Sequence, residues 1–291
     1  MSLPLRVRAP ATTANLGPGF DCAGAALDLW NELEVTEGEG IEVRGEGADE
    51  VPLGPDHLGL RAFALLAPVE GKRFVFTNRI PLASGLGSSA ATIALGLVAA
   101  TFFLGRWPEI EPLLERGLEL ESHADNLAPA LAGGVCLTWR SNGRQHVARV
   151  AQALPLTAIA VVPGGKVETV GARAALPAQI PHADAAFSVA RAALLGAGLV
   201  AGEAGLLAEA FADRLHEPYR GPLSPVFGPI RERLPAGAVG ATISGSGPTV
   251  VVWATEAEAG ACERELAERF PAARVLRLAV VPTGAGPISQ A

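Results

Sequence analysis

The alternation of hydrophobic and polar residues along the chain predicts short strands and helices in mixed order. A period of two residues, or a continuous apolar run, predicts strands over residues 5–9, 31–36, 41–44, 73–78, 133–139, 156–162, 238–243, 249–253 and 273–280. Apolar positions three and four residues apart predict helices over residues 56–66, 88–104, 108–121, 183–195, 205–215, 224–233 and 256–269, the first with Asp56 at its N-cap. Strands and helices in this mixed order predict an α+β protein of two layers.

The segment from Ala90 to Leu104 is uncharged, which raises the alternative of a membrane-spanning helix. A membrane span needs roughly 20 predominantly apolar residues, and this segment is shorter and rich in Ala, Thr and Gly. We therefore predict a helix in the core of a soluble protein. The residues before it, from Met1 to Gly17, lack the long apolar stretch of a secretory signal.

The composition indicates a soluble globular protein. The 291 residues are enough for one large domain or two ordinary ones, and 49% of them are hydrophobic and 18% charged. The formal net charge of −7 argues against general binding of nucleic acids, which basic surfaces favour. The three cysteines are widely spaced and fit a reducing cytosol, and the five histidines form no metal-binding pair.

The sequence "SGLGSSAA", residues 84–91, places glycines and serines at the start of the helix predicted over 88–104. Glycine lets backbone N–H groups approach an anion closely. The first turn of a helix carries free N–H donors and the positive end of the helix dipole. Phosphate binding at this place is therefore physically natural. The alternative is an ordinary N-cap serine with glycines that serve close packing.

Two other phosphate-binding patterns fit this loop less well. A Walker A loop requires a Lys after its last glycine, and Ser88 stands there instead. Gly85, Gly87 and Ala90 match a Rossmann fingerprint, but residues 80–84 separate them from the preceding predicted strand. The loop is therefore a candidate phosphate site of neither type.

Two further glycine-rich stretches carry small polar residues. "APATTANLGPGFD", residues 9–21, follows the first predicted strand and places Asn15 and Asp21 on a constrained turn. "GATISGSGPT", residues 240–249, lies between two predicted strands. Taken alone, the first stretch is typical of a turn and the second of a hairpin rich in glycine.

Together, the three stretches resemble the motifs of the GHMP kinases, a family of small-molecule kinases. "PLASGLGSSAA" is similar to their phosphate-binding motif, "APATTANLGPGFD" to their N-terminal motif and "GATISGSGPT" to their C-terminal glycine motif, in the order of the family. The branch that phosphorylates L-homoserine has the most similar forms, with further similarity at "HADNLAPALAGG" (123–134), "ETVGAR" (168–173) and "LHEPYRGPL" (215–223). The resemblance covers nearly the whole chain.

The resemblance implies a GHMP kinase fold of two domains. Residues 1–153 would form an ATP-binding domain like the second domain of ribosomal protein S5, with a left-handed βαβ crossover. Residues 154–291 would form a ferredoxin-like domain. We expect a cytoplasmic protein that forms a homodimer and has neither nucleic acid nor membrane as a partner.

The resemblance also implies the residues of the site. ATP would bind through Pro81, Leu82, Ala83, Ser84, Gly85, Leu86, Gly87, Ser88, Ser89, Ala90 and Ala91. The substrate L-homoserine would bind through Asn15, Asp21, His123, Asn126, Arg173 and Arg220. The two arginines would hold its carboxylate as guanidinium forks. The expected catalytic residues are Asp21, Thr169 and Arg173.

The Mg²⁺ ion that accompanies ATP is expected on Ser88 and on a helix glutamate. Glu115, Glu119 and Glu121 are the candidates, and the first two lie one helical turn apart on a shared face. Of these, we expect Glu119 rather than Glu115 to bind the ion. Relatives often carry an Asn near the adenine, where this chain has residues 56–58, so the adenine pocket stays unassigned.

Phosphoryl transfer depends on alignment and charge neutralisation more than on covalent help from the protein. Some family members use an Asp as base, and Asp125 lies in the matching region. For the homoserine branch we expect direct in-line attack by the substrate hydroxyl, assisted by Thr169 and Asp21. Two alternatives stay open: another small-molecule kinase of the mevalonate type, and a ligand sensor without catalysis. The two arginines argue against a neutral sugar, and the intact "SGLGSSAA" argues against a sensor.

Overall fold

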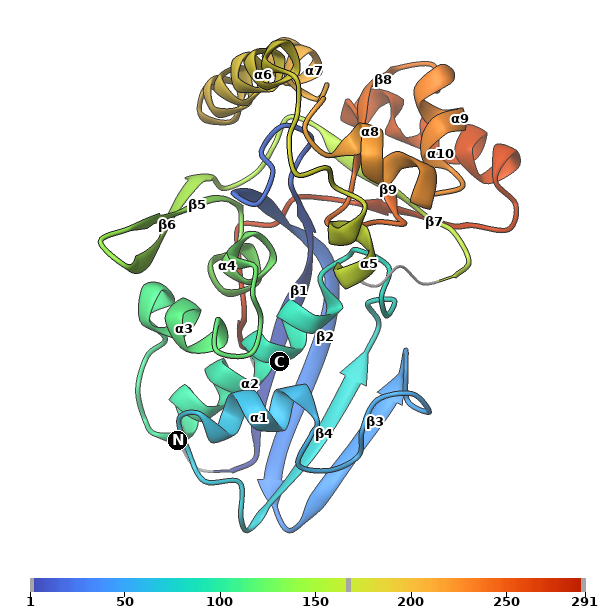
Figure 1. Ribbon diagram of the computed structural model, residues 1–291. Coiled ribbons are helices and arrows are strands. Elements are labelled where there is room, and N and C mark those ends of the chain that lie inside the picture. The colour runs from blue at the N-terminus through green and yellow to red at the C-terminus, as the bar shows by residue number, and fades with distance from the viewer. Residues whose placement is uncertain (1–2, 166–168, 289–291) are drawn as a thin grey trace.

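The computed structural model describes residues 3–165 and 169–288, which form two β-sheets with helices packed against them (Figure 1). Within these residues, the first sheet has seven strands: β1 (Leu5–Ala14), β2 (Ala23–Glu37), β3 (Gly40–Gly45), β4 (Lys72–Asn78), β5 (Val135–Ser141), β6 (Arg144–Ala151) and β11 (Gly286–Pro287). The second has four: β7 (Thr157–Val162), β8 (Ala238–Ile243), β9 (Val250–Ala254) and β10 (Arg274–Leu278). The predicted α+β class is confirmed.

The first sheet has the strand order β11-β1-β2-β4-β3, with β5 and β6 attached beside β2. β2 and β3 follow one another in sequence, but β4 lies between them, antiparallel to β2 and parallel to β3. Helix α1 (Leu58–Ala64) connects β3 to β4. The N-cap of α1 is His57, whose ring accepts a hydrogen bond from the N–H of Gly59, so the prediction of Asp56 as N-cap is wrong.

Helix α2 (Ser88–Phe103) lies in the core of this first layer. It packs against β1, α1 and α4 (Ala124–Ala132), and 13 of its 16 residues are buried. Gly96 allows the close approach of α1, because a Cβ at this position would overlap the carbonyl oxygen of Gly59. A helix that is apolar on all sides is stable only where protein surrounds it. The uncharged run is therefore a core helix, as predicted.

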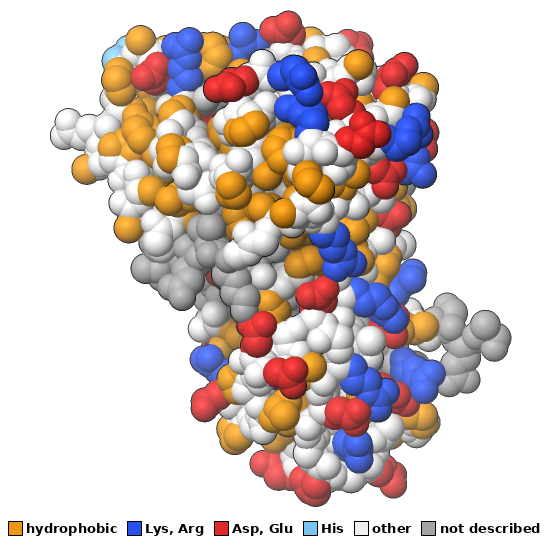
Figure 2. Space-filling view, turned by 90° about the vertical axis from the view of Figure 1, so that its right-hand side faces the viewer, with side chains coloured by type: hydrophobic (Ala, Val, Ile, Leu, Met, Phe, Trp, Pro, Cys, Tyr) orange, Lys and Arg blue, Asp and Glu red, His pale blue; other side chains and the backbone are white. Residues whose placement is uncertain are grey.

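The second sheet is antiparallel throughout, in the order β10-β7-β9-β8. The remaining helices are α3 (Ile110–Gly117), α5 (Thr169–Ala174), α6 (His182–Ala201), α7 (Ala204–Ala210), α8 (Glu217–Arg220), η1 (Gly221–Leu223), α9 (Phe227–Glu232) and α10 (Glu256–Arg269). α10 packs on β7 and β10. Figure 2 shows hydrophobic side chains gathered across the upper half of one face, while charged side chains of both signs are interspersed below.

Helix α6 is the one helix of the described residues whose length and composition would allow a membrane span. Its two ionic side chains are Asp184 and Arg191, and they pair with Arg214 and Glu209. On its inner side, Leu195 and Leu199 are buried, and the helix packs on α7. These contacts make α6 an outer helix of the second half of the protein, at the top of Figure 1.

The chain returns to the first sheet after β10. Val280 forms a bridge with Leu27, and β11 then pairs antiparallel with β1. The N–H of Ile288 also donates to the carbonyl oxygen of Arg6 (3.0 Å). Residues near the end of the chain therefore complete one edge of the sheet that the first strand begins.

Candidate active site

The glycine-rich loop forms the N-terminal end of α2. Gly87 is the N-cap in the left-handed region (φ 68°), and no side chain of the described residues caps the helix. Gly85 also has a positive φ of 89°. A Cβ on Gly85 would overlap the carbonyl oxygen of Ser244, and one on Gly87 would overlap the hydroxyl of Thr12. Glycine is therefore required at both positions, and the uncapped first turn of α2 has donors for an anion.

The three glycine-rich stretches meet around this helix end. The hydroxyl of Ser244 donates to the carbonyl oxygen of Gly85 (2.8 Å). The N–H of Thr12 donates to the carbonyl oxygen of Leu86 (3.1 Å). Thr12 of β1 and Ser244, which directly follows β8, thereby fix the backbone of the loop, which lowers the cost of ordering it around an anion.

A cavity of about 460 Å³ lies in front of the loop, a volume in the range of small-molecule sites. One end is lined by the loop and the first turn of α2. The other end is mostly apolar, with Val51, Pro52, Leu58 and Leu82. Asn78 also lines the cavity, and its buried amide oxygen has no partner in the part of the chain that the structure describes. An apolar slot with one unsatisfied acceptor suits a flat heterocycle that carries an amino group.

A second cavity of about 60 Å³ adjoins the first and is lined almost wholly by polar side chains. The two cavities share Glu121, Asn126, Gly245 and Ser246. The small cavity is further lined by Asn15, Asp21, His123, Asp125, Arg173 and Arg220. The structure thus brings together all six residues that the sequence predicts for substrate binding, directly beside the loop predicted for phosphate.

The two arginines of the small cavity lie over one aromatic ring. Arg173 donates to both carboxylate oxygens of Asp21, at 2.8 and 2.6 Å. Arg220 is 4% exposed and donates to the carbonyl oxygen of Gly245 (3.2 Å), while its buried Nε has no partner within residues 3–165 and 169–288. Phe20 lies 5.6 Å from the Arg173 guanidinium and 5.0 Å from that of Arg220. A buried guanidinium with an unused donor, next to a second one, suits a carboxylate ligand.

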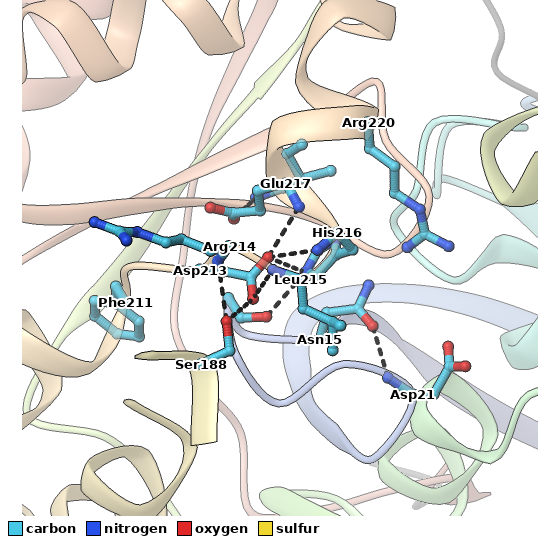
Figure 3. A network of polar contacts seen from close by, with 12 residues as sticks. Asn15, Asp21, Ser188, Phe211, Asp213, Arg214, Leu215, His216, Glu217 and Arg220 are labelled. Atoms are coloured by element: carbon cyan, nitrogen blue, oxygen red, sulfur yellow. Dashed lines mark hydrogen bonds and ion pairs between the residues drawn. The ribbon is translucent and has the colours of Figure 1, made fainter. Parts of the chain in front are cut away.

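Asn15 and Asp21 lie on a turn with unusual backbone conformation (Figure 3). Asn15, Leu16 and Asp21 have positive φ angles of 71°, 48° and 57°. The amide of Asn15 accepts from the N–H of Asp21 (3.0 Å) and donates to the carbonyl oxygen of Gly245 (2.7 Å). Because both ends of this amide are used, Asn15 holds the turn, and the carboxylate of Asp21 is left beside the cavity. Backbone strain of this kind is typical of functional sites.

Asp125 is a buried carboxylate in the wall of the small cavity. It is 4% exposed, and one of its carboxylate oxygens has no partner among the described residues. Burial, followed by the negative charge of Asp21, raises the pKa of Asp125 to about 6. The hydrogen bond with Glu121 raises the pKa of the neighbouring His123. Asp125 therefore titrates closer to neutrality than an ordinary aspartate.

Glu121 is the glutamate that reaches the serines of the loop. Its Oε2 accepts from the hydroxyl of Ser89 (3.3 Å). Ser88 lines the same cavity, and its buried hydroxyl has no partner in the described part of the chain. Burial alone would raise the pKa of Glu121, but hydrogen bonds, chiefly from His123, lower it overall. Glu121 therefore stays ionised next to the hydroxyl of Ser89, in the cavity that Ser88 also lines.

Glu119 and Glu115, which the sequence predicts as Mg²⁺ ligands together with Ser88, lie away from the cavity, whereas Glu121 lines it. Glu119 accepts from Arg116 (2.7 Å) on the exposed side of the chain after α3. Glu115 is exposed on α3, and neither residue lines the cavity. The predicted catalytic residue Thr169 is the first residue of α5, and its side chain lies outside the described residues.

The reasoning from sequence missed Asn78, Gly245 and Ser246 of the cavity walls, and also the two rings of Phe20 and His216. Phe20 lies within the quoted "GPGFD" and His216 within "LHEPYRGPL", but neither type of side chain suggested contact with the arginines. The sequence shows only that each ring lies within a segment that resembles a family motif. This placement becomes informative once the fold shows that the two segments touch.

The chain matches two family models that together cover more than half of it. The model of the GHMP kinases N terminal domain matches residues 57–134, and the model described as GHMP kinases C terminal matches residues 190–272. The chain therefore belongs to the GHMP kinase family, which consists of ATP-dependent small-molecule kinases. The predicted family and its two-domain fold are confirmed.

Among the relatives of this chain are homoserine kinases. The one from Streptomyces avermitilis is 42% identical over 282 residues, which cover 93% of this chain and 92% of the relative. The crystal structure of the homoserine kinase from Cytophaga hutchinsonii is 30% identical, with a TM-score of 0.89, and covers 99% of this chain and 98% of that one. The L. major mevalonate kinase is 18% identical with a TM-score of 0.72 over 98% and 100% of the two chains, which shows a shared fold alone.

Proposed function

We propose that the chain transfers the terminal phosphoryl group of ATP to the hydroxyl of L-homoserine, giving O-phospho-L-homoserine for the biosynthesis of threonine. One observation carries the proposal: the uncapped end of α2 opens into a cavity that continues into a polar pocket with two arginines. The similarity to homoserine kinases over nearly the whole chain supports it. Similarity to a mevalonate kinase is limited to the fold.

The charges of the small cavity match an amino-acid zwitterion. A carboxylate between Arg173 and Arg220 would satisfy the unused Nε of Arg220. The ammonium group would face the carboxylate of Asp21. Asn126 accepts from the hydroxyl of Thr12 (2.8 Å), which leaves its amide nitrogen for the substrate hydroxyl. His123 borders the same pocket.

In the cavity in front of the glycine-rich loop, the nucleotide would bind with its phosphates at the loop and its base at the apolar end. Its phosphates would take the N–H groups of the loop from Gly85 to Ser89, where the helix dipole favours negative charge. The base would lie against Val51, Pro52 and Leu58. The amino group of adenine would then donate to the unsatisfied amide oxygen of Asn78. This direction places the terminal phosphate next to the small cavity.

The residues at the loop also fit a Mg²⁺ ion. The unpartnered hydroxyl of Ser88 and the ionised Glu121 are oxygen ligands of the kind that Mg²⁺ prefers. No group of three or more His, Cys, Asp or Glu side chains in the described residues could hold a metal alone. Two protein ligands suit a Mg²⁺ ion whose remaining ligands are mostly phosphate oxygens. We propose Ser88 and Glu121 as its protein ligands; when bound, the ion offsets the charge of the phosphates.

The arrangement supports direct in-line attack by the substrate hydroxyl. The protein holds the acceptor and the phosphates in adjoining cavities, which supplies the alignment that phosphoryl transfer requires. Asp21, Thr169 and Arg173 would orient the acceptor. The variant Asp125→Asn tests for a base: under direct attack it keeps kcat within about tenfold. A dedicated base would cost about 10²–10⁴-fold with unchanged binding of both substrates.

An assay of ADP release with L-homoserine, mevalonate, galactose and shikimate in parallel tests the function. We expect kcat/KM for homoserine to exceed the other values by about a hundredfold or more, because only an amino acid matches both charges of the pocket. Preference for mevalonate would support the other kinase. ATP binding without turnover of any acceptor would support the sensor.

Two further expectations follow from the proposed function. We propose a cytoplasmic location, which the free Cys22, Cys136 and Cys262 suit, because disulfides are rare in that compartment. Association of two copies of the chain stays a prediction. Light scattering after size-exclusion chromatography measures it directly.

A further inference from the structure

His216 lies outside both cavities, yet it connects α8 to the turn that carries Asp21 (Figure 3). Its side chain is fully buried, and its Nε2 lies 2.9 Å from the carbonyl oxygen of Gly17. Because a carbonyl oxygen only accepts, Nε2 carries the proton in this hydrogen bond. Nδ1 is buried without a partner among the described residues, which agrees with a neutral ring. Burial lowers the pKa of His216 and so favours the same state.

The ring of His216 also packs on the aromatic side chain of the site. It stacks on Phe20 with a centroid distance of 5.0 Å and an angle of 23°. Phe20 in turn contacts the guanidinium groups of Arg220 and Arg173. A continuous row of packed groups therefore leads from His216 to both arginines that we propose for the substrate carboxylate.

A buried carboxylate fixes the orientation of His216. Asp213, which is 5% exposed, accepts from the backbone N–H groups of Leu215, His216 and Glu217 at 2.9, 2.7 and 2.9 Å. It also accepts from the hydroxyl of Ser188 on α6 (3.1 Å). These bonds fix the backbone turn before α8. They therefore also fix the position from which the imidazole ring donates to the carbonyl oxygen of Gly17.

We propose that His216 is a positioning residue for the amino-acid substrate: by holding Gly17 and Phe20, it sets the placement of Arg220 relative to Arg173 and Asp21. The inference rests on the proposed function, because it assigns the arginines to the carboxylate of homoserine. His216 does not line the cavity proposed for ATP. The row of packed groups that begins at His216 ends at the two arginines of the small cavity, so we expect its effect on the acceptor side of the site.

The test compares two substitutions that remove different parts of the imidazole. His216→Phe keeps a flat ring on Phe20 but removes the donor to Gly17. His216→Gln removes the ring but keeps an N–H donor. We expect His216→Phe to raise the KM for homoserine by about ten- to a hundredfold, the range for misplaced binding groups. The KM for ATP should change by less than about twofold, and His216→Gln should recover part of the loss.

His182→Phe is the control, because it makes the same exchange of an imidazole for a phenyl ring away from the site. His182 is the exposed first residue of α6 and lines neither cavity. This variant should leave both KM values unchanged. If His216→Phe fails to fold, Phe20→Leu interrupts the same row of groups, and calorimetry then compares its affinity for homoserine with its affinity for ATP.

The possible results separate the two proposals. A selective loss of affinity for homoserine supports the positioning role. Equal changes for homoserine and ATP would show a general structural role and overturn it, as would unchanged values in an active enzyme. A wild-type protein without activity towards homoserine would instead refute the proposed function, and this inference with it.

Discussion

The Oγ of Ser89 lies 3.3 Å from the Oε2 of Glu121, although 32 residues separate the two in sequence. This contact brings the carboxylate to the phosphate loop, in the cavity that Ser88 also lines. Glu121→Gln removes the charge but keeps the shape. We expect the Mg²⁺ concentration for half-maximal activity to rise by about tenfold, because Mg²⁺ prefers charged oxygen ligands. The measurement is a Mg²⁺ titration of activity at saturating ATP and homoserine.

Glu119→Gln is the control for this prediction. Glu119 pairs with Arg116 on the exposed side of the chain, so the substitution should leave the Mg²⁺ dependence unchanged. If the two variants behave alike, or if Glu119→Gln has the larger effect, Glu121 is not the metal ligand.

Arg220→Ala is expected to affect the acceptor far more than the nucleotide. The guanidinium is buried, and the carboxylate that we assign to it would lose a charge-assisted hydrogen bond of about 1.5–3 kcal/mol. The KM for homoserine should therefore rise by about ten- to a hundredfold, while the KM for ATP stays within about twofold. Arg144→Ala removes an exposed arginine of β6 and should change neither value. A parallel loss for both substrates would contradict the assignment.

Gly87→Ala is expected to abolish most ATP binding. An added Cβ would overlap the hydroxyl of Thr12, and the left-handed backbone adds strain of about 1 kcal/mol. Gly105→Ala separates the two effects, because Gly105 has a similar φ of 71° but open space around its Cα. We expect at least a tenfold weaker affinity for nucleotide in the first variant and no change in the second. Equal affinities in calorimetry would show that the shape of the loop is not needed.

Buried Glu217 makes the stability of the folded protein depend on pH. Its Oε1 accepts from the N–H of Ile243, and burial raises its pKa from 4.5 to about 8. Between these two pH values the folded state binds more protons than the unfolded state, so stability falls as pH rises from about 4.5 to 8. The stability that the protonated carboxyl contributes is therefore fully present below about pH 4.5 and is lost above about pH 8.

Glu217→Gln removes this effect. As pH increases from 5 to 9, the melting temperature of the variant should rise relative to that of the wild type. A difference of about 1 kcal/mol in the free energy of unfolding corresponds to a few degrees. Melting temperatures of both proteins over this range provide the measurement. Parallel curves for the two proteins would mean that Glu217 is ionised in the folded state throughout.

The predicted strand 238–243 and helix 256–269 coincide with β8 and α10. In α10 the helical pattern is clear, because Ala259, Cys262 and Leu266 form one buried face. The predicted strand 5–9 is too short, since β1 continues to Ala14. The second half of β1 is buried on both faces and an irregularity follows Pro10, so the alternation of hydrophobic and polar residues ends there. No helix is predicted from the sequence at α4, because Pro129 lies within it and a proline inside a helical pattern argues against a continuous helix.

The residues of the site were accessible from the resemblance, but their placement depends on tertiary structure. The helical spacing of Glu115 and Glu119 argued for a shared face. However, α3 ends at Gly117, and the chain beyond it leaves the helix. Glu121 therefore turns towards Ser89, where helical spacing no longer applies. Similarly, no pattern in the sequence indicates that Phe20 and His216 stack.

The pairing of β11 with β1 makes the first half of the protein depend on the last segment of the second. Cutting the chain near residue 153 would leave the first strand with a bare edge, so neither fragment would be self-contained. Chimaeras that exchange acceptor specificity between relatives should therefore transfer the internal segment and retain residues 280–288 with their own N-terminal sheet.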